Sequence, residues 1–232
     1  MNETTERIEG RPVQVTAGPV TLEGDLNLPE GAQAIVLFAH GSGSGRHSSR
    51  NRYVARVLNE AKLATLLLDL LTAEEEAIDL RTAHLRFNIG LLGARLIGAT
   101  DWLTQYAATR RLPIGYFGAS TGAAAALVAA AERPEDVKAV VSRGGRPDLA
   151  GPALPLVRAP TLLIVGGNDF EVIALNRAAF ALLRREKDLV IVPGATHLFE
   201  EPGALEEVAR LARDWFHRHL VSDVPSVARA SR

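Results

Sequence analysis

The stretch IGYFGASTGAAAA, residues 114–126, joins an apolar run to an alanine-rich segment through the pattern Gly-x-Ser-x-Gly. Residues 114–117 predict a buried strand, and the alanines from Ala123 onward predict a helix. A serine on the tight turn between such a strand and helix has a strained backbone, which exposes its hydroxyl group at the end of the sheet. The flanking glycines avoid collisions that side chains would make there. We therefore expect Ser120 to be a nucleophile, with the amino end of the following helix favouring negative charge beside it.

Short apolar runs of the same kind recur along the chain and alternate with helical patterns. The other predicted buried strands are residues 34–39, 65–68, 137–141, 161–165 and 189–192. Apolar residues at helical spacing predict helices at 52–61, 89–109, 123–132, 173–187 and 204–220. Segments 13–16 and 20–28 surround a turn-prone Ala-Gly-Pro and predict an opening β-hairpin. We therefore expect an α/β fold in which βα units wind around one mostly parallel sheet, with helices on both faces.

Segment 72–86 fits neither pattern clearly. It contains three consecutive glutamates, Glu74 to Glu76, and is compatible with a loop or with a short solvated helix. A run of like charges is usually a solvated surface, so we assign this segment no function.

The composition limits the kinds of protein that the chain can be. Its 232 residues predict a single domain over residues 1–232, with an ordered core of about 11–221. The 26 Lys and Arg residues balance the 27 Asp and Glu residues, so a nucleic-acid partner is not expected. The chain has no cysteine, which excludes disulfides and thiolate chemistry. An acidic start and the absence of a long apolar run predict neither a signal peptide nor a membrane partner, so a cytoplasmic location is expected.

A nucleophilic serine needs a base, and the base needs a group that orients it. His197 follows the last predicted strand and is the predicted base. Asp169 follows the strand at 161–165 and is the predicted acid, because Ser, Asp, His is the chain order of such triads in this kind of fold. Asp148 and Glu171 remain alternative acids.

The other five histidines are weaker candidates for the base. His40 ends a buried strand and is expected to have a structural role. His47 could line a pocket but has no evident partner, and His84 lies in the unassigned segment. His217 and His219 are expected to face solvent on the last helix.

The loop FAHGSGSGRHSSRN, residues 38–51, follows the first buried strand after the hairpin and is rich in glycine and serine. A Walker A loop would need a lysine that is absent from residues 41–52, and a dinucleotide fingerprint would need glycine in place of Arg46. The position instead suits the loop that supplies one backbone N–H to an oxyanion hole. We predict the amides of Ser42 and Thr121 as the donors, with Gly43 as the alternative to Ser42.

The combination of HGSGSG, GASTG, GGNDFEV and GATHLF resembles small serine-bearing members of the dienelactone hydrolase-like group of α/β-hydrolases. This resemblance extends from about residue 13 to residue 220. It implies a three-layer fold with a central eight-stranded sheet whose first strands are antiparallel, and it implies Ser120, Asp169 and His197 as nucleophile, acid and base. Dienelactone hydrolase itself uses a cysteine nucleophile, which this chain lacks, so ester hydrolysis in general is expected rather than activity on dienelactones.

Several arginines follow the predicted strands and are candidates for binding a substrate carboxylate. Arg143 is the best of these, and the others are Arg46, Arg50, Arg52 and Arg146. Residues 142–160 form a short, proline-rich connection where lipases of this fold carry an inserted lid, so we expect no lid domain and an open cleft for small acyl groups.

The predicted function is hydrolysis of small carboxylic esters through an acyl-enzyme, with no metal or cofactor. The substrate, a small-molecule ester, is the only partner predicted, and the oligomeric state is left open. An acyltransferase or thioesterase with the same triad is the alternative, and a non-catalytic binding module is a third interpretation.

Overall fold

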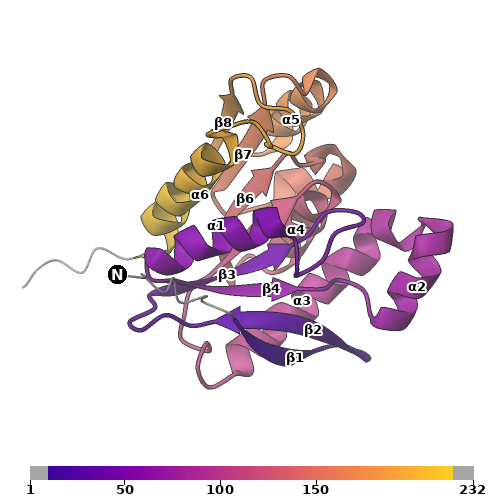
Figure 1. The fold of residues 1–232 in the computed structure, drawn as a ribbon, viewed down its shortest axis with the longest axis vertical. Helices are drawn as coiled ribbons and strands as arrows, with labels where there is room; N and C mark the ends of the chain where they lie inside the picture. Colours follow the sequence, from indigo (N-terminus) through magenta and orange to yellow (C-terminus); the bar gives the residue numbers. More distant parts are fainter. Residues whose placement is uncertain (1–9, 222–232) are drawn as a thin grey trace, which may run out of the picture.

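A single eight-stranded sheet runs through the computed structural model, which describes residues 10–221 (Figure 1). The strands are β1 (Arg11–Ala17), β2 (Val20–Asn27), β3 (Ala34–Ala39), β4 (Leu63–Leu68), β5 (Ile114–Ala119), β6 (Val137–Arg143), β7 (Thr161–Gly166) and β8 (Lys187–Val192). Their order in the sheet is β1-β2-β4-β3-β5-β6-β7-β8. The β1–β2 and β2–β4 pairs are antiparallel, and the remaining pairs are parallel. The predicted mostly parallel sheet with an antiparallel start is confirmed.

The burial of each strand follows its sequence pattern. β3, β4, β5 and β7 are buried along their whole length, as continuous apolar runs predict for strands covered on both faces. In β2 the buried residues alternate with more exposed ones. Because β3 and β5 to β8 are parallel, their carboxyl ends emerge at the same edge of the sheet, where the loops that follow them meet.

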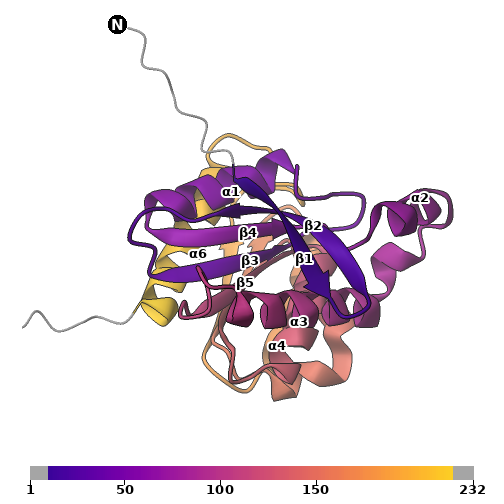
Figure 2. The same cartoon turned by 90° about the horizontal axis from the view of Figure 1, so that it is seen from below.

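Helices cover both faces of the sheet, which makes three layers (Figure 2). One face carries α1 (Ser49–Glu60) and α6 (Ala204–Leu220), and the other carries α3 (Ile89–Gln105), α4 (Thr121–Glu132) and α5 (Phe170–Leu182). Six of the seven alanines of α4 are fully buried, so this helix lies close to the strands. The 3₁₀ segment η2 (Pro147–Leu156) packs against α4 and α5, and forms no lid domain. None of the helices within residues 10–221 has the length and apolarity needed to cross a membrane.

The structure corrects the predicted bounds of four helices, among them α4, which begins at Thr121 rather than at residue 123. α1 begins at Ser49 rather than at residue 52, because Ser48 caps it by accepting a hydrogen bond from the Asn51 amide. α3 ends at Gln105 rather than at 109. The helix predicted at 173–187 is α5, which begins at Phe170 and ends at Leu182, and the lysine at position 187 already belongs to β8. The ammonium group of that lysine donates to the carbonyls of Phe180 and Leu183, which are otherwise without helical partners.

Segment 72–86 contains a helix, α2 (Ala73–Thr82), and the start of the 3₁₀ turn η1 (Leu85–Phe87). Thr72 and Glu75 form a capping box, in which each side chain accepts a hydrogen bond from the other residue's backbone amide. α2 stands apart from the two helical layers and follows β4 at the carboxyl edge of the sheet (Figure 1). The segment is therefore a helix and a turn close to the loops of the candidate site.

The chain before residue 10 and after residue 221, for which we predicted frayed ends, lies outside the described residues.

Candidate active site

Ser120 lies on the predicted tight turn between β5 and α4. Its φ of 49° and ψ of −122° are unusual for a residue with a side chain. Its amide donates to the carbonyl of Arg143 and its carbonyl accepts from the amide of Arg146, so the strand next to β5 holds the turn in place. A Cβ atom at Gly118 would lie 2.4 Å from the Cα of Ala123, and one at position 122 would lie 2.3 Å from the carbonyl oxygen of residue 39. Both glycines of the pattern are therefore required by the close approach of backbone.

Asp169 and His197 form a hydrogen-bonded pair at the same edge of the sheet. Asp169 directly precedes α5 in the connection from β7, and His197 lies in the loop after β8. The Nδ1 atom of His197 lies 2.7 Å from Oδ2 of Asp169. Because a carboxylate can only accept here, Nδ1 carries a proton, which leaves Nε2 as the ring nitrogen that could act as a base. The structure thus brings together two of the three residues predicted from the sequence.

The loop after β6 links this pair to Ser120. Arg143, at the end of β6, accepts the hydrogen bond from the Ser120 amide, and Gly144 follows it. A Cβ atom at Gly144 would lie 3.7 Å from Cε1 of His197. The end of β6 therefore contacts the backbone of the serine, and the glycine that follows it leaves room beside the ring of the histidine.

The two predicted oxyanion donors lie next to each other. Thr121 is the first residue of α4, so its amide has no partner within the helix. The hydroxyl groups of Ser42 and Thr121 are 3.0 Å apart and share a hydrogen bond. Gly43 has a φ of 68°, which makes glycine the suitable residue for the turn, and the amide of Ser44 closes it onto the carbonyl of Gly41. The glycine–serine loop is thus fixed against the amino end of the nucleophile's helix.

His40 makes hydrogen bonds through both ring nitrogens at the start of this loop, which is the structural role that we predicted. Its Nδ1 donates to the Gly41 carbonyl at 2.9 Å, and its Nε2 accepts from the Leu70 amide at 3.0 Å. Burial lowers the pKa of His40, in agreement with a neutral ring that has one donor and one acceptor. Both ring nitrogens are engaged, so this histidine is not available as the base.

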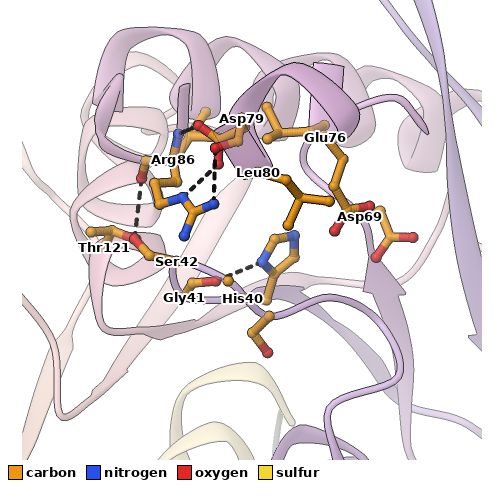
Figure 3. A pocket seen from close by; sticks show the side chains of 13 residues that line it. His40, Gly41, Ser42, Asp69, Glu76, Asp79, Leu80, Arg86 and Thr121 are labelled. Carbon is orange, nitrogen blue, oxygen red and sulfur yellow. Dashed lines mark hydrogen bonds and ion pairs between the residues drawn. The ribbon is translucent and has the colours of Figure 1, made fainter. Parts of the chain in front are cut away.

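A pocket that is partly open to solvent lies beside Ser42 and Thr121 (Figure 3). Its far wall comes from α2 and η1, which supply Glu76, Asp79, Leu80 and Arg86. Sequence reasoning missed these wall residues because it assigned segment 72–86 no function. The capping-box spacing was the available signal, since it predicts a helix start directly after β4.

Asp79 and Arg86 hold the wall together. Oδ1 of Asp79 accepts from the amides of Leu85 and Arg86, at 2.7 and 3.1 Å, and Oδ2 accepts from the Arg86 guanidinium at 2.5 Å. Burial alone would raise the pKa of Asp79, but these hydrogen bonds and the guanidinium charge keep it below the usual value. The carbonyl of Arg86 accepts from the Ser42 hydroxyl at 3.4 Å, so the wall also contacts the oxyanion loop.

The arginines after the strands have different surroundings. Arg46 pairs with Asp69, Glu23 and Asp25, and thereby ties the glycine–serine loop to β2 and to the end of β4. Arg146 donates hydrogen bonds of 2.9 Å to both carboxylate oxygens of Asp148, so this alternative acid is paired with an arginine rather than with His197. Arg143 is 8% exposed, and no carboxylate within residues 10–221 pairs with it.

Within residues 10–221, none of the hydrogen bonds, ion pairs or ring contacts of the remaining histidines involves Ser120. His47 is exposed and lies against Arg52 and Asp25, and His84 and His217 are exposed. The prediction of a solvated His219 is wrong, because its ring packs on Trp215 with centroids 4.4 Å apart and its side chain is 10% exposed.

Comparisons with known proteins find similar chains over nearly the full length. The crystal structure of a dienelactone hydrolase from Anabaena variabilis is 66% identical, with a TM-score of 0.90 over 92% of this chain and 99% of that one. An α/β serine hydrolase without a lid from Xanthomonas campestris is 19% identical, with a TM-score of 0.70 over 90% of this chain and 94% of that one, which shows the same fold. No protein-family model matches the chain.

Curated relatives carry a different description. Two Mycobacterium tuberculosis proteins named "Putative phosphoribosyl transferase" are 61% identical over 214 residues, which is 92% of this chain. The chain spans 47% of their length, about half.

Proposed function

Because the chain belongs to the dienelactone hydrolase family and has the α/β-hydrolase fold, we propose that it is a serine hydrolase that cleaves small carboxylic esters. The observation that carries this proposal is the hydrogen bond of 2.7 Å between Asp169 and His197, at the sheet edge where Ser120 has a strained backbone. A base held by a carboxylate near a serine of this kind is the arrangement that nucleophilic acyl transfer requires.

In the proposed reaction, Ser120 Oγ attacks the carbonyl carbon of the ester while Nε2 of His197 takes the hydroxyl proton. The π electrons of the carbonyl move to its oxygen, and the tetrahedral intermediate forms. Asp169 keeps the imidazole oriented through Nδ1 and stabilises the imidazolium. The amides of Ser42 and Thr121 donate to the oxyanion, and each such donor is typically worth about 10²–10³ in kcat.

Collapse of the intermediate breaks the bond between the carbonyl carbon and the leaving oxygen, which receives the proton from His197. The acyl group is then an ester of Ser120. Water attacks this ester while His197 again takes a proton, and returning that proton to Ser120 Oγ releases the carboxylic acid. Apart from the ester and water, the proposed cycle uses the side chains and amides of the candidate site.

The pocket favours small acyl groups. It is formed by loops and by the wall from α2 and η1, and the connection between β6 and β7 forms 3₁₀ turns against α4 and α5 instead of a lid. Long acyl chains would extend into solvent from such an opening. Strong preference for long-chain over short-chain esters would contradict this part of the proposal.

Acyl transfer to an alcohol, amine or thiol, or hydrolysis of a thioester, uses the same acyl-enzyme and is the second candidate. Phosphoribosyl transfer is not proposed for this chain, because the relatives with that name are about twice as long as the stretch that matches. We further propose that the substrate is the chain's small-molecule partner and that the protein acts in the cytoplasm.

A fluorophosphonate probe tests the proposal most directly. We expect the wild-type protein to be labelled on Ser120 and to hydrolyse nitrophenyl butyrate, and both activities to disappear in Ser120→Ala. Ser142→Ala is a matched control, because this buried serine lies on the neighbouring strand β6 and is not part of the proposed reaction. Adding alcohols, amines or thiols during turnover distinguishes transfer from hydrolysis. Folded wild-type protein that takes up no label would refute the nucleophile.

A further inference from the structure

Asn176 is a fully buried asparagine in the second turn of α5, the helix that directly follows Asp169. Its Nδ2 donates to two backbone carbonyls, that of Val172 at 2.8 Å and that of Gly145 at 2.9 Å. Because carbonyl oxygens can only accept, these two contacts fix the orientation of the amide group. Its Oδ1 is buried and has no hydrogen-bond partner in the part of the chain that the structure describes.

The stability of α5 does not explain an asparagine at this position. Asparagine is a poor residue for the interior of a helix, and a buried amide oxygen without a partner is unfavourable. Val172 lies one helical turn before Asn176, so its carbonyl belongs to the helix and needs no side-chain donor. The hydrogen bond to Gly145 is therefore the contact that only a polar side chain can supply here.

Gly145 belongs to the segment that holds the turn of Ser120. The amide of Gly144 donates to a carbonyl of β7 at 2.8 Å, and the amide of Arg146 donates to the carbonyl of Ser120 at 3.0 Å. Between these two residues, the carbonyl of Gly145 accepts the hydrogen bond from Asn176. A displacement of Gly145 would therefore move the neighbouring residue that holds the nucleophile's turn.

α5 is joined to the acid and the base at its other end. Asp169 directly precedes the helix, and its carboxylate is bonded to His197. The amide of Asn168 also donates to the carbonyl of Ala195 at 2.9 Å, which ties the connection before α5 to the loop of the base. The acid, the base and α5 thus form one hydrogen-bonded unit, and Asn176 joins this unit to the segment that holds the nucleophile.

We propose that Asn176 is a positioning residue that sets the distance between the hydroxyl group of Ser120 and Nε2 of His197. This inference rests on the proposed function, because it concerns the transfer of the serine proton to the base. Asn176 is fully buried, so it does not touch the ester and acts through the backbone of Gly145 and through α5. Misplacement of a reacting group by about 1 Å can reduce a rate by about 10²-fold.

Substitution by leucine removes the hydrogen bond to Gly145 and keeps a side chain of similar size. Leucine also favours helices and leaves no amide oxygen unpaired, so we expect Asn176→Leu to fold. With nitrophenyl butyrate, kcat should fall about 10- to 100-fold. KM should stay close to that of wild type, because the walls of the pocket are unchanged.

Asn59→Leu is the matched control. Asn59 is also a buried asparagine, and its Nδ2 donates to the carbonyl of Leu63 at 2.9 Å and to Oγ1 of Thr65 at 3.1 Å. It lies near the end of α1, and Leu63 begins β4, so these contacts lie at the edge of the sheet opposite the candidate site. Asn59→Leu loses comparable hydrogen bonds and should keep the wild-type kcat.

Two further measurements separate positioning from a general loosening of the fold. The low-field proton resonance of the hydrogen bond between Asp169 and His197 should remain in Asn176→Leu, because both residues stay with α5. For the same reason, the pH at which kcat/KM is half-maximal should match that of wild type. Hydrogen exchange of the Arg146 amide, the donor to the carbonyl of Ser120, should be faster in Asn176→Leu and unchanged in Asn59→Leu.

Asn176→Ser keeps the test decisive if the leucine variant does not fold. A serine hydroxyl can donate to the carbonyl one turn earlier in its own helix, here that of Val172, but it is too short to reach Gly145. We expect the same loss of kcat and the same faster exchange at Arg146 as in Asn176→Leu.

The positioning role and the hydrolase fail in different ways. If the folded Asn176 variants have the wild-type kcat, or if Asn59→Leu loses as much, the positioning role is wrong and the hydrolase stands. If wild type hydrolyses no ester, the proposed function fails. Exchange at Arg146 still tests the contact in that case: faster exchange would support the connection between Asn176 and the turn of Ser120, and unchanged exchange would overturn it.

Discussion

Replacement of Gly41 by alanine should slow the enzyme without unfolding it. A Cβ atom at position 41 would lie 2.9 Å from the Cβ of Ser120 and 3.2 Å from the carbonyl oxygen of Ala119. An ordinary contact begins near 3.4 Å, so the two Cβ atoms must move apart by about 0.5 Å. Misplacement of a reacting group by about 1 Å can reduce a rate by about 10²-fold. We therefore expect kcat/KM to fall about 10- to 100-fold, together with slower fluorophosphonate labelling of Ser120.

The same substitution elsewhere in the chain supplies the control. At Gly90, in the first turn of α3, a Cβ would meet only Oδ1 of Asn88 at 3.6 Å. Gly90→Ala should leave the rate unchanged and raise stability by about 0.5–1 kcal/mol, as alanine does in a helix. Nitrophenyl butyrate hydrolysis, labelling rates and thermal unfolding are measured on both variants. A folded Gly41→Ala protein with the wild-type rate would show that Gly41 does not set the position of Ser120.

Three further predictions concern the acid, the pH dependence and the pocket wall. Asp169→Asn should lower kcat about 10³- to 10⁴-fold with the fold intact, because an amide no longer holds the imidazole in the required tautomer. Steady-state kinetics measures kcat, and circular dichroism shows whether the variant is folded. The free energy of unfolding should decrease as pH falls below 6.5, because burial lowers the pKa of His40 in the folded protein and the unfolded chain therefore binds the proton more readily. Urea titrations at two pH values measure this change, and His40→Gln should show a smaller dependence of the unfolding free energy on pH. Asp79→Ala should speed amide hydrogen exchange across residues 73–87 and raise KM, because the wall of the pocket loses three hydrogen bonds.

The sequence predicted the parts of the site that depend on strand order. Ser120, Asp169 and His197 each follow a strand of the parallel part of the sheet, and parallel strands bring the residues that follow them to one edge. The predicted end of α5 was wrong because Arg, Glu and Lys at 184–187 are good helix formers, while the Lys187 ammonium group that closes the helix is recognisable only in three dimensions.

The sequence analysis missed the lining of the pocket wall and the unpaired state of Arg143 for a different reason. The only buried residue of α2 is Asp79, so this helix has no apolar stripe that a periodicity search can detect. The pairing of Asp79 with Arg86 depends on the turn between α2 and η1. Whether an arginine has a counter-charge depends on which acidic residues the fold brings near it, and for Arg143 it brings none within the described residues.

The contacts that build the site join distant parts of the chain, and this has a consequence for its biosynthesis. The hydrogen bond between Ser42 and Thr121 spans 79 residues, and the one between Asp169 and His197 requires the loop after β8, the last strand. A ribosome-bound chain that ends before this loop would contain the serine and the acid but not the base. The nascent chain would therefore have no esterase activity until this loop is made and folded. In refolding from denaturant, the return of activity would report formation of these long-range hydrogen bonds rather than formation of any single helix or strand.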